Sequence, residues 1–332
     1  MKRLFARLFG GRGAAAPAAA GSPDAAVTAA PAAALHVETA AAPVAIDLDL
    51  AFFHWLARPH VSSTPVADAP IFDELARLAR DPSAAATMVP RVPAVIPQLL
   101  RTLRAESSST GELARQVAQD AVLVAEVIRE VNSSLFRPTT PVRNLEGALL
   151  LLGQNGLRML LARVAFRPII SQQAGPLLRL LAPPLWRQSE LCAQAAGLLA
   201  PRHGADPFEA YLAGLMHNVG LMVAFRVVEQ LVPPGALPDA DDFGARLVAA
   251  ARLISARIAD EWELPPAIGH AIAHPGDAGA LPTLLQDADR LAKLQMLAMG
   301  GQPLFVRAVL ALAPEARHVY DRLLEQSDRQ DA

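Results

Sequence analysis

The stretch YLAGLMHNVG, residues 211–220, decides the fold. A strong helix start precedes it, because Asp206 can cap the helix and Pro207 presets the backbone of the first turn. Glu209 adds an acid to that first turn, where the helix dipole favours negative charge. The sequence therefore predicts that a helix begins at Asp206 and carries this segment.

Helical spacing continues on both sides of this segment. Ser109 followed by Glu112 is a capping box. Two apolar stripes have the spacing of core-facing helices: Val124, Val127, Ile128 and Val131, then Phe243, Leu247, Ala251, Ile254 and Ile258. We expect Pro265 and Pro266 to end the second of these helices. No stretch alternates convincingly between apolar and polar residues, so we predict an all-α fold, a multi-helix bundle without internal repeats.

Composition divides the chain into four parts. Residues 1–45 hold mostly Ala and Pro beyond a short basic start, which predicts a disordered tail. Residues 46–87 are interpreted as a short helical preamble, residues 88–295 as the main helical domain, and residues 296–332 as a C-terminal helical extension.

The composition, net charge and cysteine count limit the possible functions. A hydrophobic fraction of 52% supports a large core, and a net charge of −2 gives no reason to expect nucleic acid as a partner. The single cysteine, Cys192, excludes a disulfide within the chain and favours a reducing cytoplasm, with Cys192 as a small buried apolar residue. No apolar run approaches the roughly 20 residues that span a bilayer.

The first twelve residues allow one membrane hypothesis. Four cations alternate with four apolar residues that would share one side of a helix: Lys2, Arg3, Arg7 and Arg12, with Leu4, Phe5, Leu8 and Phe9. Weak interfacial contact and a disordered basic end both remain open. The segment is similar to an organellar transit peptide, and Arg7 interrupts any secretory signal.

Several short motifs, taken in order, resemble those of an HDOD domain. They are VPRVP (89–93), LA (113–114) with Asp120, VNSSLF (131–136), PVRNL (141–145) with Ala148, LG (152–153), LR (157–158), WRQS (186–189), YLAGLMHNVG (211–220), WELP (262–265) and ADRL (288–291). The resemblance covers roughly residues 88–295. It implies a helical bundle related to the HD phosphohydrolases and their HD-GYP relatives, used as a regulatory output module in bacterial signalling.

The resemblance also indicates where a metal site would lie. Related HD phosphohydrolases hold one or two divalent metals with a His, a His-Asp pair and a later Asp. Gln188 stands at the first His, His217 matches the His of the pair, Asn218 replaces its Asp, and Asp289 matches the last Asp. The additional His of the HD-GYP group would fall near Ala251.

These positions offer too little charge for a metal. Amide oxygens of Gln188 and Asn218 do not offset the dehydration of a divalent ion as carboxylates do. We therefore predict a vestigial site at Gln188, His217, Asn218 and Asp289, with no metal, no cofactor and no catalytic residue.

Four further residues are weaker candidates for ligand binding. His270 and His274 would share a face of a continuous helix, although no third ligand has a recognisable spacing and Pro275 follows directly. Arg158 and Arg187 have the planar fork that suits phosphate.

Three functions are compatible with these residues. The first is a non-catalytic bacterial signal-transduction output or scaffold protein, located in the cytoplasm, that binds a signalling protein or a small ligand. The alternative is a residual metal-dependent phosphohydrolase acting on nucleotides or cyclic dinucleotides, with His217 and Asp289 helped by His270 or His274. The third is a metal-free nucleotide receptor in which Arg158 or Arg187 pairs with phosphate.

Overall fold

The computed structural model of the chain describes residues 46–57, 62–64, 66–89, 117–118, 121–133, 136, 138–171, 175–238 and 242–331. Three sequence predictions lie outside these residues: the disordered tail over residues 1–45, the membrane contact through residues 1–12, and the capping box of Ser109 and Glu112.

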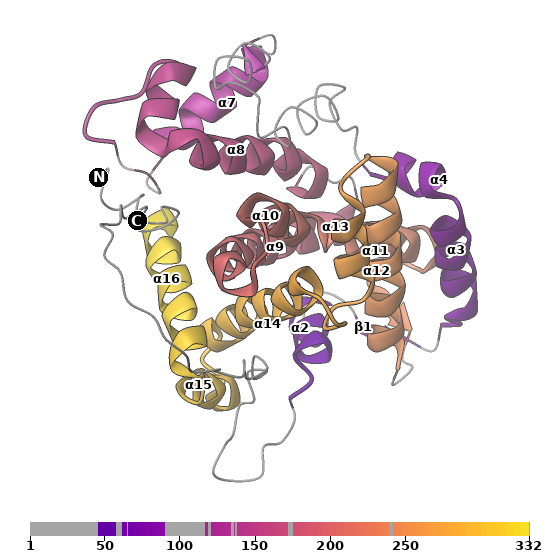
Figure 1. Ribbon diagram of the computed structural model, residues 1–332. Coiled ribbons are helices and arrows are strands. Elements are labelled where there is room, and N and C mark those ends of the chain that lie inside the picture. The colour runs from indigo at the N-terminus through magenta and orange to yellow at the C-terminus, as the bar shows by residue number, and fades with distance from the viewer. Residues whose placement is uncertain are drawn as a thin grey trace, which may run out of the picture.

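Helices form nearly all of the described part of the chain, so the all-α prediction is confirmed (Figure 1). The helices are α2 Leu48–Ala57, α3 Ala69–Arg80, α4 Pro82–Thr87, α7 Ala121–Val131, α8 Leu145–Ser171, α9 Pro176–His203, α10 Pro207–Met216, α11 Val219–Leu231, α12 Phe243–Glu261, α13 Pro266–Ala273, α14 Ala280–Met299, α15 Pro303–Leu310 and α16 Pro314–Asp331.

Two of the predicted helix signals are present as expected. Asp206 is the N-cap of α10 and accepts a hydrogen bond from the Glu209 N–H at 2.7 Å. The apolar stripe that begins at Phe243 forms the buried face of α12, which ends at Glu261, and Pro266 opens α13.

One small parallel sheet corrects the expectation that the chain has no strands. Strand β1, Ser62–Thr64, pairs with β2, Ala236–Pro238, in the register Ser62 to Ala236. Three residues are too few to show an alternating pattern, and the two strands lie far apart in the sequence. The pair ties the segment after α2 to the loop between α11 and α12.

The core lies around α9, which contacts α10 and α14 along its length and α8 on another side. In Figure 1, α9 and α10 occupy the middle of the bundle, with α8 above, α14 below, and α11 and α12 to the right. The half of α9 that runs from Leu185 to Ala200 is almost entirely buried, mainly through Leu and Ala side chains. A helix surrounded in this way can bring polar side chains to the centre of the molecule.

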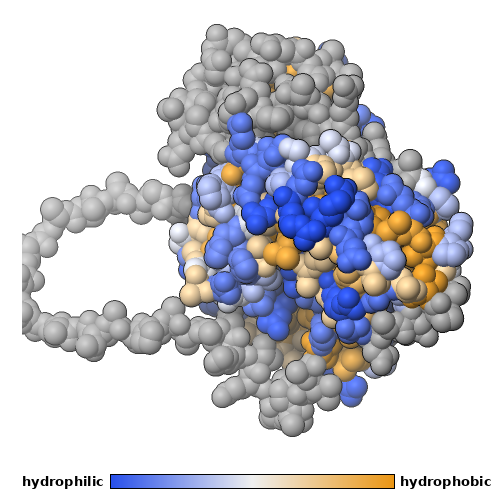
Figure 2. Space-filling view, turned by 90° about the vertical axis from the view of Figure 1, so that its right-hand side faces the viewer, coloured by the Kyte–Doolittle hydropathy of each residue, from blue (hydrophilic) through white to orange (hydrophobic). Residues whose placement is uncertain are grey.

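The segments outside residues 88–295 pack onto this core. Helix α2 contacts α14, α12 and α9, and α3 and α4 contact α12. Helices α15 and α16 cover one end of α14 and α9. Figure 2 views the molecule from the side of α3 and α4, where hydrophilic and hydrophobic residues are interspersed.

Two helical stretches, Leu145–Pro168 and Pro207–Leu231, are long and apolar enough by composition to cross a membrane. The sequence-based expectation that no apolar run approaches this length is therefore too strict. The windows are 61% and 89% buried inside the fold, and buried core helices pass the same test. The second stretch is also two helices, since α10 and α11 are separated at His217 and Asn218.

A buried ion-pair cluster joins α7, α8 and α9. Arg163 donates from Nε to Glu190 at 2.5 Å and from Nη1 to Glu130, and all three side chains are largely buried. Burial opposes the charged form of Arg163, but the two glutamates outweigh it and raise its pKa. Arg167 lies 3.6 Å from Glu130 and is half-exposed, so it offsets little of the charge there.

Removing the central cation should destabilise the protein. We expect Arg163→Met to lower the free energy of unfolding by about 3–5 kcal/mol, because two carboxylates remain buried without their partner. The control is Arg129→Met, which breaks an exposed pair with Glu126 on α7 and should cost at most about 1 kcal/mol. Urea unfolding measures both, and equal losses would contradict a structural role for the cluster.

Candidate functional site

The four positions predicted for a vestigial site come together where α9, the α10–α11 turn and α14 meet. The Gln188 amide is fully buried, and its Nε2 donates to Asp289 Oδ1 at 2.6 Å. Its oxygen accepts a hydrogen bond from Asn218 Nδ2. Asn218 also donates to Ser189 Oγ at 3.2 Å. The two amides therefore form a hydrogen-bonded chain that ends on the carboxylate.

The α10–α11 turn is held against α12 by a serine and a glycine. Ser255 Oγ accepts from the Gly220 N–H at 2.7 Å and donates to the His217 carbonyl at 2.8 Å. A Cβ at Gly220 would lie 2.0 Å from the Ala251 carbonyl oxygen, so a side chain cannot fit there. This close contact and the two Ser255 hydrogen bonds hold the α10–α11 turn against α12.

The His217 ring points toward Asp289. Its Nδ1 lies 2.6 Å from the Gly214 carbonyl oxygen, and its Nε2 lies 3.3 Å from Asp289 Oδ1. Nε2 has no hydrogen-bond partner among the described residues.

Cys192 is a residue of the site that the sequence-based prediction missed. It is buried as predicted, but its sulfur, a ring nitrogen of His217 and an oxygen of Asp289 all lie within 4.8 Å of one another. Burial raises the pKa of the Cys192 thiol well above its ordinary value, and the nearby Asp289 carboxylate raises it further. The group is therefore a thiol at neutral pH.

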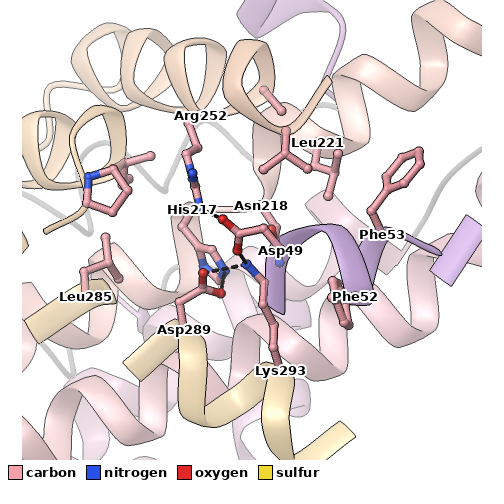
Figure 3. Close-up of a pocket in the computed structure, with 14 residues that line it drawn as sticks. Asp49, Phe52, Phe53, His217, Asn218, Leu221, Arg252, Leu285, Asp289 and Lys293 are labelled. Carbon is pink, nitrogen blue, oxygen red and sulfur yellow. Dashed lines mark hydrogen bonds and ion pairs between the residues drawn. The ribbon is translucent and has the colours of Figure 1, made fainter. Parts of the chain in front are cut away.

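A lysine is the second missed residue, and it is in direct contact with the carboxylate. Lys293 Nζ lies 2.6 Å from Asp289 Oδ2 and 2.6 Å from Asp49 Oδ1 (Figure 3). The other oxygen of Asp49 lies 2.6 Å from Arg252 Nη2. Asp49 comes from α2, Arg252 from α12, and Lys293 from α14.

The charges in this network balance. Burial alone would raise the pKa of Asp289, but Lys293, His217 and Arg252 outweigh it and hold that pKa well below its usual value. The Asp49 pKa is also lowered, since Lys293 and Arg252 outweigh burial and the neighbouring Asp289. Burial would lower the pKa of Lys293, yet the two carboxylates raise it. Two carboxylates thus face two cations at neutral pH.

These side chains do not fit a divalent metal ion. Asp289 already accepts from Gln188 on one oxygen and from Lys293 on the other. A metal would have to displace the Lys293 ammonium, and a cysteine ligand would have to lose a proton that burial holds in place.

The network lines a small pocket that is partly open to solvent. Charged and polar side chains occupy one part of its wall: Asp49, His217, Asn218, Arg252, Asp289 and Lys293. The rest is mostly apolar and includes Leu221, Ile272 and Leu285. The cations of the pocket are therefore Arg252 and Lys293.

The other predicted ligand residues do not line this pocket. Arg158 is buried on α8, and Arg187 is half-buried on α9. His270 and His274 are exposed, and their ring centroids lie 5.2 Å apart at the end of α13. Within the described ranges, the one three-residue cluster suited to a metal is the set of Cys192, His217 and Asp289.

The chain is a helical bundle with a polar site at its centre. His217 lies at the junction of α10 and α11, and Asp289 lies on the neighbouring helix α14. This is the architecture of the HD superfamily. A protein-family model described as the HDOD domain matches residues 89–277. The chain belongs to the HDOD domain family.

Solved structures show the same fold. An HDOD domain protein with unknown function from Geobacter sulfurreducens is 23% identical, with a TM-score of 0.53 over 76% of this chain and 99% of that one. A provisionally named phosphohydrolase from Shewanella amazonensis SB2B is 19% identical, with a TM-score of 0.53 over 79% and 96%. A provisionally named signal transduction protein from Marinobacter aquaeolei VT8 is 20% identical, with a TM-score of 0.54 over 82% and 66%. A comparison with curated proteins gave no match.

Loss of the Lys293 ammonium should lower the stability of the fold, and a second substitution at Asp289 should restore part of it. We expect Lys293→Met to lower the free energy of unfolding by about 3–5 kcal/mol, since Asp289 keeps a buried charge without its main partner. Adding Asp289→Asn should recover at least about 1 kcal/mol, because the pair is directly coupled. Chemical unfolding of the two variants measures this coupling, and strictly additive losses would contradict it.

Proposed function

We propose that this chain is a non-catalytic signalling protein, located in the cytoplasm, whose HDOD domain acts by binding a partner protein or a small ligand. One observation carries the proposal: the Lys293 ammonium lies between Asp289 and Asp49, beside the position where related HD phosphohydrolases hold a metal. The site therefore contains a permanent cation, the Lys293 side chain on α14.

An ammonium cannot replace a metal in hydrolysis. A divalent ion lowers the pKa of a bound water and polarises the phosphoryl oxygen, and both effects need open coordination positions. Lys293 instead donates hydrogen bonds to Asp289 and Asp49. Gln188 and Asn218 add amide groups where the HD pattern has an imidazole and a carboxylate, and they too are used in hydrogen bonds. The arrangement favours a fixed, charge-balanced site over a reactive one.

The family supports the proposed regulatory role. The resemblance implies that HDOD domains serve as output modules in bacterial signalling, and one relative of similar fold carries a signal transduction name. A domain that keeps its helical frame and a solvent-accessible pocket without a reactive centre is suited to binding.

Residual phosphohydrolase activity is the second candidate, and one feature favours it. Cys192, His217 and Asp289 form a compact three-ligand cluster, and the contact of His217 Nδ1 with a backbone carbonyl is typical of metal-binding histidines. One structural neighbour carries a phosphohydrolase name. Lys293 weighs against this candidate, because a metal at Asp289 would lie beside a buried ammonium.

Metal content distinguishes the two candidates. We expect the full chain, purified without chelator from cells supplied with iron, manganese and zinc, to retain less than about a tenth of an equivalent of any of them. It should not hydrolyse bis(p-nitrophenyl) phosphate or cyclic dinucleotides. Elemental analysis and a colorimetric assay of the same sample measure both properties.

A restored variant provides the matched comparison. The triple change Gln188→His, Asn218→Asp and Lys293→Ala supplies an imidazole and a carboxylate and removes the competing cation, so metal retention should rise toward one equivalent. Stoichiometric metal in the unchanged protein, with turnover that His217→Ala abolishes, would refute the non-catalytic proposal.

A further inference from the structure

The Asp49 carboxylate is held as a bound anion would be. Each of its oxygens lies 2.6 Å from a different cation, Lys293 on one side and Arg252 on the other. In Figure 3, Arg252 reaches Asp49 from one wall of the pocket and Lys293 from the opposite wall. Asp49 belongs to α2, which precedes the residues matched by the HDOD family model. The family domain thus supplies Arg252, and a segment outside it supplies the anion.

We propose that Arg252 and Lys293 form an oxyanion-binding site, that Asp49 fills it as a built-in ligand, and that a small phosphate-bearing molecule competes with α2 for it. This inference rests on the proposed function, because a metal at Asp289 would change the charges of the pocket. It names the ligand class and the mode of regulation for that same site.

The charges of the pocket favour an anion once Asp49 leaves. Arg252 and Lys293 then face Asp289 alone, so two cations oppose one carboxylate. Arginine presents a planar fork and lysine a compact charge, and both are common phosphate partners. A phosphate dianion carries more charge than the Asp49 carboxylate and has an additional oxygen for hydrogen bonding. It can therefore outcompete Asp49 at these two cations.

The packing of α2 allows Asp49 to leave without unfolding the domain. Phe53 anchors the helix, with its ring centroid 6.1 Å from Phe225 and 6.2 Å from Phe243. Gly244 leaves the space for this ring, since a Cβ there would lie 2.6 Å from it. Asp49 lies in the first turn of α2, where residues are half-buried, whereas Phe52, Phe53 and Leu56 are buried. A shift of the first turn frees the cations and leaves the aromatic anchor in place.

The lining of the pocket suits a small organic phosphate better than a polymer. Departure of Asp49 would widen the pocket beside the two cations, and the apolar wall of Leu221, Ile272 and Leu285 suits a phosphate ester with an apolar group. Nucleic acid needs a row of cations along its backbone, and this pocket offers two.

The test is calorimetric titration of the full chain with phenyl phosphate at constant ionic strength. We expect Asp49→Ala and Asp49→Asn to bind at least about tenfold more tightly than the unchanged protein, because the internal competitor is gone. The control is Asp68→Ala, which removes a 2.6 Å ion pair to Arg246 on the same helix α12 but outside the pocket, and should leave the affinity unchanged. Adding Arg252→Ala to Asp49→Ala should abolish binding.

Hydrogen exchange provides a readout for α2 itself. Saturating phenyl phosphate should increase amide exchange in residues 46–57 of the unchanged protein and of Asp68→Ala. Equal affinities of the unchanged protein and both Asp49 variants, or binding that survives the loss of Arg252, would overturn the inference.

Metal analysis of the titrated samples separates the two proposals. Stoichiometric metal that a chelator removes together with phenyl phosphate binding would refute both the proposed function and this inference. Metal-free protein whose Asp49 variants do not bind phenyl phosphate would refute this inference alone.

Discussion

The Lys293 ammonium, buried between two carboxylates, is the constraint around which the centre of the molecule is organised. A buried cation is stable only when it is paired and hydrogen-bonded. Asp289 is one partner, one helical turn away on α14, and Asp49 is the other, from α2. Asp49 in turn requires Arg252 on α12. The position of α2 and the charge state of the central carboxylate are therefore linked, and neither can change without affecting the other.

The amides of the site are consistent with this internal cation. In a metal site, Asp289 would give its oxygens to the ion, and neighbouring carboxylates would share the charge. With one ammonium in place of a divalent ion, a further carboxylate at position 218 would leave negative charge unpaired in the core. Asn218 and Gln188 avoid this, because an amide can donate to the remaining oxygen of Asp289 and accept from its neighbour. Gln188, Asn218 and Lys293 together leave the buried Asp289 carboxylate hydrogen-bonded and its charge neutralised.

Local patterns in the sequence were sufficient for the helices and for part of the site. The spacing of apolar residues and the cap at Asp206 predict α10 and α12. Two missed residues had a readable signal, since Lys293 follows Asp289, and Cys192 follows Gln188, at the four-residue spacing of one helical face. Arg252 directly follows the position where the HD-GYP pattern expects a further histidine. Asp49 had none, because its place depends on the packing of Phe53 against Phe225 and Phe243, far away in the sequence.

The contacts of Asp49 bear on where the domain boundary of the chain lies. Composition places a boundary between residues 46–87 and residues 88–295, and the family match begins at residue 89. The ion pairs of Asp49 cross this boundary, as do the aromatic contacts of Phe53 and the pairing of β1 with β2. A fragment that begins at the family match would keep Arg252 and Lys293 but lose the anion that lies between them. In such a fragment Arg252 and Lys293 would face Asp289 alone, so it should bind anions more readily than the full chain does.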